Sequence, residues 1–311
     1  MRFFVAVTDN AWFRYLAALK PDEVNFWQPS GRARFSAVRT GGPFLFKLHS
    51  PLNYIVGGGF FVRHSFLPLS IAWDAFGEKN GAKDHATLRT MILSLRAGEA
   101  PADPTIGCIV LAEPFFLPED RWIPVPSDWS ANIVRGKTYD MDDPIGASLW
   151  QQVRVNMIAA APAQESGVPV AVAEETPRYG SDYLTHARLG QGAFRVLVTE
   201  AYQRRCAMTG EKTLPVLQAA HIKPFAESGP HRISNGILLR ADLHILLERG
   251  YLTLTQELRM EASRRIKEDF DNGDQYVALH GKPLCVVPDG VRSRPSPEFI
   301  RWHNENRFLG G

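Results

Sequence analysis

The chain has 311 residues, of which 45% are hydrophobic and 22% charged, a composition typical of folded domains that stay in water and unlike that of disordered or collagen-like chains. Its 35 Lys and Arg residues nearly balance its 33 Asp and Glu residues, so charge alone neither requires nor excludes a polyanionic partner. Three widely spaced cysteines predict no disulfide framework and no structural zinc site. Because no apolar run is long enough for an export signal or a membrane helix, we expect a cytoplasmic protein.

The first half of the chain is predicted to form strands with a few short helices. Apolar and aromatic runs between Gly and Pro predict strands at residues 3–7, 44–48, 54–56, 60–62 and 106–111, and helical spacing predicts helices at 12–19 and 87–96. The Gly57-Gly58-Gly59 run lacks the Lys and Ser/Thr of a phosphate-binding loop, so close packing or a bulge explains it better. We therefore expect a small, strongly bent sheet or barrel.

A change of composition predicts where the chain divides. Residues 157–175 are rich in Ala, Pro, Val and Glu and contain no aromatic residue, which is typical of a connection between domains. We predict an N-terminal domain at residues 1–155, a linker at 156–177 and a second domain at 178–311. Residues 1–177 carry 16 Lys and Arg against 18 Asp and Glu, whereas residues 178–311 carry 19 against 15 and six of the nine histidines. The second domain is therefore where we expect the chemistry.

The segment at residues 206–254 carries the most informative pattern. Apolar runs at 216–219 and 237–239 predict two strands joined by a Pro- and Gly-rich loop, and a helix follows. The first strand leads into His221, and the helix contains His244 and Glu248, which share one helix face because they are four residues apart. Asp242 stands where it can cap that helix.

These residues resemble the HNH, or ββα-metal, nucleases. The family pattern is a His after the first strand, an Asn in the loop and a His or Asn on the helix, and His221, Asn235 and His244 follow it with spacings of 14 and nine residues, within the runs AAHIKP and NGILLRADLH. The resemblance implies that His221 is the general base that activates water and that Asn235 fixes the loop. It further implies that His244 ligates a divalent metal, Mg²⁺ or Mn²⁺, on the scissile phosphate.

The remaining metal ligands are less well defined by this resemblance. Many relatives carry a metal-binding Asp or His immediately before the base, where this chain has Ala220, which cannot ligate. Glu248 or Asp242 can supply the missing oxygen, and Glu248 is favoured because it shares the helix face of His244. His231 lies in the loop and is expected to face solvent.

Parts of residues 1–150 resemble the EVE domains of the PUA superfamily, which include readers of modified bases. The runs that carry this resemblance are FFVAVTDN at 3–10, EVNFWQPS at 23–30, FLFK at 44–47 and IVGGGF at 55–60. The resemblance implies a pocket for a flipped base, in which stacking on aromatic rings contributes about 1–3 kcal/mol. The candidate walls are Trp27 and Trp73, and the candidate polar edges are Asp9, Asn10, Tyr54 and Ser30. Packing in the core of the sheet is the competing role for these aromatic residues.

Together the resemblances imply an α+β protein with an N-terminal PUA-like (EVE) bent β-barrel with short helices and a C-terminal ββα-metal HNH domain. The expected function is a metal-dependent endonuclease that cuts double-stranded DNA carrying modified bases, modified cytosine above all. Two alternatives stay open, a non-catalytic reader of modified nucleic acid with a degenerate HNH domain, and an HNH nuclease acting on phosphorothioate DNA or RNA. The sequence also leaves open whether a homodimer makes both cuts.

Overall fold

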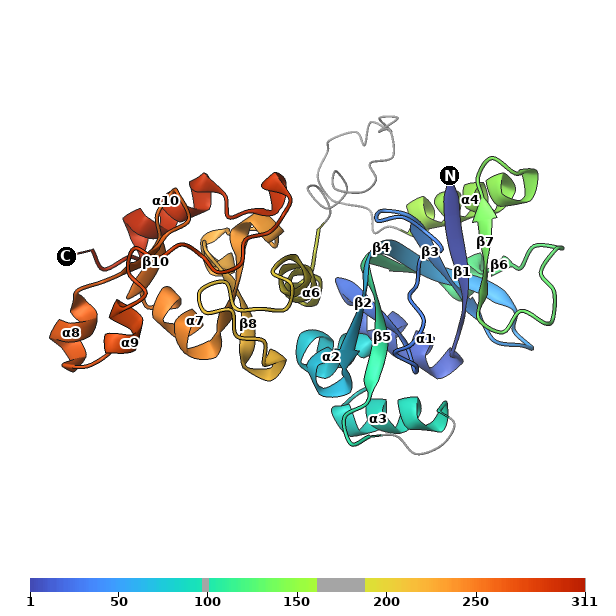
Figure 1. The fold of residues 1–311 in the computed structure, drawn as a ribbon. Helices are drawn as coiled ribbons and strands as arrows, with labels where there is room; N and C mark the ends of the chain where they lie inside the picture. The colour runs from blue at the N-terminus through green and yellow to red at the C-terminus, as the bar shows by residue number, and fades with distance from the viewer. Residues whose placement is uncertain (97–100, 161–187, 311) are drawn as a thin grey trace. The chain divides into compact units, whose positions relative to one another are not determined.

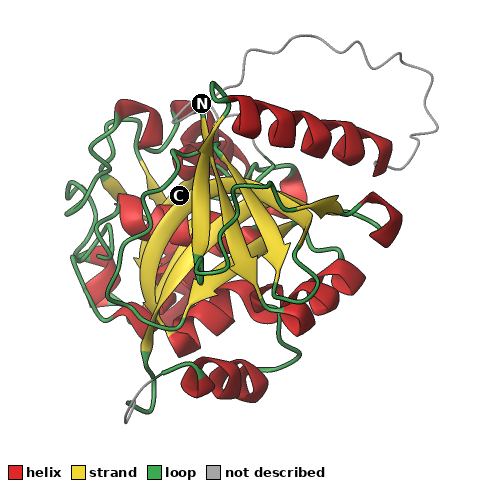
Figure 2. Ribbon diagram, turned by 90° about the vertical axis from the view of Figure 1, so that its right-hand side faces the viewer, coloured by secondary structure: helices red, strands yellow, loops and turns green. Residues whose placement is uncertain are grey.

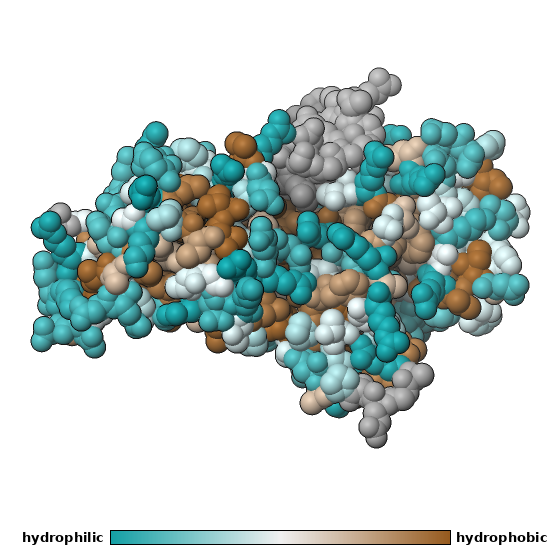
Figure 3. Space-filling model, in the orientation of Figure 1, coloured by the Kyte–Doolittle hydropathy of each residue, from teal (hydrophilic) through white to brown (hydrophobic). Residues whose placement is uncertain are grey.

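The computed structural model describes residues 1–96, 101–160 and 188–310, which divide into two compact units, Met1–Ala193 and Phe194–Gly311. The predicted linker at residues 156–177 begins inside a helix that ends at Ala160, and the rest of it lies outside the described residues. No helix in the described ranges is long and apolar enough to cross a membrane. On the face drawn in Figure 3, hydrophobic patches are separated by hydrophilic side chains.

A mixed sheet forms the centre of the first unit (Figure 1). Its seven strands are β1 (Arg2–Thr8), β2 (Glu23–Gln28), β3 (Pro43–Leu48), β4 (Tyr54–Pro68), β5 (Thr105–Phe116), β6 (Ile123–Pro124) and β7 (Gly136–Asp140). They follow the order β2-β5-β4-β3-β1-β7, with β6 added beside β4, and only β1 and β3 run parallel to each other.

The sheet is twisted, as Figure 2 shows, but the predicted barrel is not closed. The end strands β2 and β7 do not pair with each other among the described strands. Closure depends on a hydrogen-bonded contact between distant segments, which local sequence patterns do not encode. The α+β class is confirmed, and the first unit adds the helices α1 (Asn10–Leu19), α2 (Leu69–Phe76), α3 (His85–Ser94) and α4 (Pro144–Ala160).

The three consecutive glycines lie inside β4, which joins two predicted strands into one. A Cβ atom on Gly57 would lie 2.4 Å from the carbonyl oxygen of Phe115, and one on Gly58 would lie 2.6 Å from that of Phe44. The register against β5 shifts between Gly58 and Phe60. These glycines therefore allow neighbouring strands to approach closely and form a bulge, which confirms the packing interpretation.

The second unit is built around two small antiparallel sheets. Its strands are β8 (Leu217–His221), β9 (Gly236–Arg240), β10 (Leu252–Leu254) and β11 (Met260–Ala262), and its helices are α6 (Gln191–Ala201, which begins in the first unit), α7 (Ala241–Glu248), α8 (Arg265–Phe270), α9 (Asp274–Val277) and α10 (Pro297–Asn306). The predicted strand, loop, strand and helix correspond to β8, β9 and α7. Helix α10 packs on β10, burying Phe299, Ile300 and His303.

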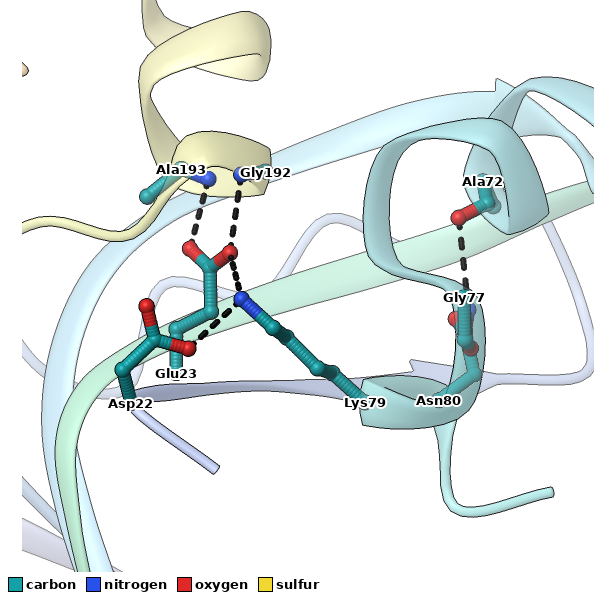
Figure 4. Close-up of polar contacts among 8 residues, drawn as sticks. All are labelled: Asp22, Glu23, Ala72, Gly77, Lys79, Asn80, Gly192 and Ala193. Carbon is teal, nitrogen blue, oxygen red and sulfur yellow. Dashed lines mark hydrogen bonds and ion pairs between the residues drawn. The ribbon is translucent and has the colours of Figure 1, made fainter. Parts of the chain in front are cut away.

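A buried acidic side chain fixes the start of α6 within the first unit (Figure 4). The carboxylate of Glu23, which is fully buried, accepts hydrogen bonds from the backbone N–H groups of Gly192 at 2.8 Å and Ala193 at 2.7 Å. Lys79 donates to the same carboxylate at 2.9 Å and reaches Asp22 at 2.6 Å. A negative charge at a helix N-terminus is favourable, and here it also satisfies backbone donors that would otherwise be buried without partners.

We predict that Glu23→Ala lowers the free energy of unfolding of the first unit by roughly 3–5 kcal/mol, because it leaves buried donors and a lysine without their acceptor. Asp22→Ala is the matched control and should cost less than about 1 kcal/mol, since the Asp22 side chain is 62% exposed. Urea unfolding followed by tryptophan fluorescence measures both, because six of the seven tryptophans lie in the first unit. Equal losses in the two variants would contradict the assignment.

Candidate active site

His221 is the last residue of β8 and pairs with Gly236 at the start of β9. The preceding residue, Ala220, is completely buried in the core of the second unit, and its methyl side chain offers no atom that can ligate a metal. The His221 ring stacks on Phe194, with 3.9 Å between ring centroids and 8° between planes. Burial, aided by the charges that His231 and His244 can carry, lowers the pKa of His221 to about 4. The imidazole is therefore neutral near pH 7.

Asn235 closes the loop that follows His221. Its side chain is completely buried, and its Oδ1 accepts from the backbone N–H of Lys223 at 2.9 Å. Its Nδ2 donates to the carbonyl oxygens of Lys223 at 2.9 Å and Pro230 at 3.0 Å. The Asn235 backbone carbonyl also accepts from Ile222 at 2.9 Å. One side chain thus joins both ends of the loop and fixes the chain immediately after His221.

His231 belongs to the site, so the expectation that it faces solvent was wrong. Its Nδ1 lies 3.0 Å from Nε2 of His221, and its ring stacks on Phe225 at 4.4 Å and 9°. No sequence signal pointed to this contact. It depends on the path of the loop, because His231 follows Pro230, whose carbonyl oxygen Asn235 binds.

A second group of polar side chains connects α7 with β8. Nδ1 of His244 lies 2.7 Å from Oε1 of Gln218, a carboxamide oxygen that can only accept, so Nδ1 carries the proton. Nε2 of His244 lies 3.2 Å from Oε1 of Glu248. Burial lowers the pKa of His244 more than the Glu248 carboxylate raises it, which favours the neutral ring. The sequence predicted the His244–Glu248 pair from its spacing but gave no indication of Gln218.

The donor set of His244 and Glu248 fits a divalent metal. A neutral Nε2 and a carboxylate oxygen are two electron-pair donors, and at 3.2 Å from each other a shared cation satisfies both. Among the residues that the structure describes, no cluster of three or more His, Cys, Asp or Glu side chains has a metal-binding arrangement.

Asp242 is not brought to this pair. Its carboxylate accepts from Arg240 Nε at 3.0 Å and from the Tyr276 hydroxyl at 3.2 Å. The N-cap position of α7 is Arg240, without a side-chain cap, so the predicted capping role of Asp242 is wrong. Arg240 instead holds the pKa of the Asp242 carboxyl below its ordinary value. Asp242 therefore stabilises the start of α7 through an ion pair.

The first unit contains a cavity of about 450 Å³ that is lined mainly by aromatic and apolar side chains. Three of the predicted pocket residues, Asp9, Trp27 and Ser30, line it. The Trp27 indole is held in place because its Nε1 donates to the carbonyl oxygen of Asn80 at 2.9 Å. Asn10 is next to the cavity, since its Oδ1 accepts from the backbone N–H of the lining residue His49 at 3.2 Å.

The other predicted pocket residues lie elsewhere in the first unit. Trp73 packs against His85, and Tyr54 packs against Trp122. The sequence missed several residues that do line the cavity, Phe4, Phe26, Gln28, Phe35, His49 and Arg135. Of these, Gln28 stands out because its Oε1 is buried and has no hydrogen-bond partner in the described part of the chain.

Comparison with known proteins bears most directly on the second unit. The HNH endonuclease family matches residues 206–255, the range that contains His221, Asn235, His244 and Glu248. No curated protein matches the chain.

Two solved structures show weak similarity. One is a mutant of the ZmASCH protein from Zymomonas mobilis, with a TM-score of 0.34 and 7% identity over 49% of this chain and 97% of that chain. The other is the modification-dependent TagI restriction endonuclease, with a TM-score of 0.28 and 15% identity over 91% of this chain and 75% of that chain. The family match covers His221, Asn235, His244 and Glu248, and it shows that residues 206–255 of this chain form an HNH endonuclease domain.

Proposed function

We propose that the protein is a modification-dependent DNA endonuclease in which the first unit reads a modified base and the second unit hydrolyses a phosphodiester bond. The observation that carries the hydrolytic assignment is the half-buried His221 at the end of β8, which is neutral near pH 7 because its pKa is lowered and which lies within the matched HNH range. In this proposal His221 is the general base, Asn235 fixes its loop, and His244 and Glu248 hold a divalent metal. The first unit is assigned to the PUA-like (EVE) class as part of the same proposal.

The chemistry proposed for the second unit follows from the states of its side chains. A neutral imidazole can take a proton from the water that attacks phosphorus, whereas an imidazolium cannot. Gln218 holds the His244 proton on Nδ1, which leaves Nε2 for ligation. When bound, a divalent metal neutralises charge that develops on the phosphate and on the leaving oxygen. A phosphate placed beside His221 raises the pKa of the ring, because an opposite charge favours the protonated form. Bound DNA would therefore make His221 a stronger base.

The proposed base-reading site is the cavity of the first unit. Its volume of about 450 Å³ falls in the usual range for small-molecule sites, roughly 300–1,000 Å³. Trp27 offers a ring face whose orientation is fixed by Asn80, and stacking on such faces is the main energetic term for an extruded base. Gln28 lines the same cavity, and its carboxamide is a group that can donate to and accept from the edge of an extruded base. These features support an extruded base as the ligand, and a modified cytosine is the base assigned to the cavity in this proposal.

A panel of duplexes tests the proposed function. The substrates carry unmodified cytosine, 5-methylcytosine, 5-hydroxymethylcytosine or phosphorothioate linkages, with RNA as a further arm, and each is incubated with Mg²⁺ or Mn²⁺. We expect cleavage of a duplex that contains modified cytosine, and a loss of roughly 10²–10⁴-fold in rate for His221→Ala with little change in DNA affinity. Binding without cleavage under both metals would favour a non-catalytic reader. Equal cleavage of the unmodified duplex would contradict modification dependence.

We predict that Trp27→Ala weakens binding of modified duplex by about 1–3 kcal/mol, roughly 5- to 150-fold, and removes the preference over unmodified duplex. Trp73→Ala is the matched control, since Trp73 packs against His85 outside the cavity and should leave the preference intact. Fluorescence anisotropy with both duplexes measures the ratio of affinities. If Trp73→Ala abolished the preference and Trp27→Ala did not, the base-reading site would lie elsewhere.

A further inference from the structure

We propose that His231 is a positioning residue that selects the tautomer of His221 required for a general base. The inference deepens the proposed function and rests on the role assigned there to His221. The observation that carries it is the 3.0 Å contact between Nε2 of His221 and Nδ1 of His231. Neither the family pattern described above nor the spacing of the motif includes His231.

A single proton lies between the two rings, and its place decides what His221 can do. If Nδ1 of His231 held this proton, Nε2 of His221 would be the acceptor, and a neutral His221 would carry its own proton on Nδ1 with no lone pair left for water. If Nε2 of His221 holds the proton and donates it, Nδ1 of His221 keeps the lone pair. Only the second arrangement gives a base. The hydrogen bond described for the His221 ring involves Nε2, which leaves Nδ1 as the atom that would accept the proton of water in this proposal.

The surrounding rings hold both histidines in this arrangement. His221 stacks on Phe194 at 3.9 Å, His231 stacks on Phe225 at 4.4 Å, and the two imidazoles lie 5.0 Å apart with 52° between their planes. The loop that carries His231 is closed by Asn235 through the carbonyl oxygen of Pro230. The contact between His221 and His231 is therefore held in place by Phe194, Phe225 and Asn235.

The choice of a histidine as the partner has a consequence for charge. In hydrolases where a carboxylate orients the catalytic His, it fixes the tautomer and also stabilises the imidazolium. A neutral His231 that carries its proton on Nε2 accepts at Nδ1, and it thereby fixes the tautomer of His221 without placing a negative charge beside it. The other titratable side chain that acts on His221 is His244, which likewise carries no negative charge. His231 thus orients the base while leaving it neutral.

Two substitutions distinguish the effect of the acceptor atom of His231 from the effect of its ring. His231→Phe keeps a ring that can stack on Phe225 but removes the acceptor, and it should slow single-turnover cleavage roughly 100-fold with unchanged DNA affinity. His231→Asn places an amide oxygen near the position of Nδ1, and we expect it to recover the rate to within about tenfold of the parent protein. Both are measured in the full-length protein with the duplex that is cleaved fastest.

The outcomes distinguish this proposal from the proposed function. A parental rate for His231→Phe, or equal rates for His231→Phe and His231→Asn, would overturn the positioning role. If His221→Ala cleaves at the parental rate, the base assignment itself fails, whereas an inactive His221→Ala with a fully active His231→Phe rejects His231 alone. ¹⁵N NMR of the unsubstituted protein gives a readout that does not depend on folding of a variant. A protonated Nε2 on His221 supports the proposal, and a protonated Nδ1 with a bare Nε2 contradicts it.

Discussion

The arrangement of the nuclease site depends on the hydrogen bonds made by the buried carboxamide of Asn235. It binds the backbone of Lys223 and of Pro230, so the two ends of an otherwise irregular loop are held by a single side chain. His221 lies two residues before Lys223, and His231 directly follows Pro230. A side chain that can donate and accept at once is required at this position, which explains why an amide serves here. The positions of both histidines therefore follow from the same set of hydrogen bonds.

Burial is the second constraint, and it acts on the ionisation of the site. Phe194 covers one face of His221, and burial is the main cause of the lowered pKa of both His221 and His244. A general base and a metal ligand both require the neutral ring, so one physical effect prepares both histidines for their proposed roles. The two acidic residues of α7 have different partners. Glu248 pairs with His244, whereas Asp242 forms an ion pair with Arg240.

The parts of the site that the sequence predicted are those set by local geometry. The apolar runs and their separation predicted β8, β9 and α7, and the four-residue spacing on a helix predicted the contact between His244 and Glu248. The contacts of Gln218 and His231 were not predicted because their partners lie on other elements, at separations along the chain that periodicity does not reveal. These contacts exist only once the loop and the strand pair have formed.

The same limit applies to the first unit. Alternation predicted most of its strands, yet the glycines at 57–59 suggested a break where β4 continues through a bulge. Trp27 and Trp73 are equally aromatic, and only the tertiary structure shows that one lines the cavity while the other packs against His85. The openness of the sheet likewise depends on pairing between its distant ends.

The claim that most of this account depends on is that His221 is a half-buried base that stays neutral at pH 7, and its titration by ¹⁵N NMR in the metal-free protein tests this most directly. We predict a midpoint near 4, because burial disfavours the imidazolium. Phe194→Leu, which removes the stacked ring, should move the midpoint toward the ordinary value of about 6.5. Because the unfolded chain binds this proton more tightly, stability should fall as pH decreases from about 6.5 toward 4. A midpoint at or above about 6.5 in the unsubstituted protein would contradict the account.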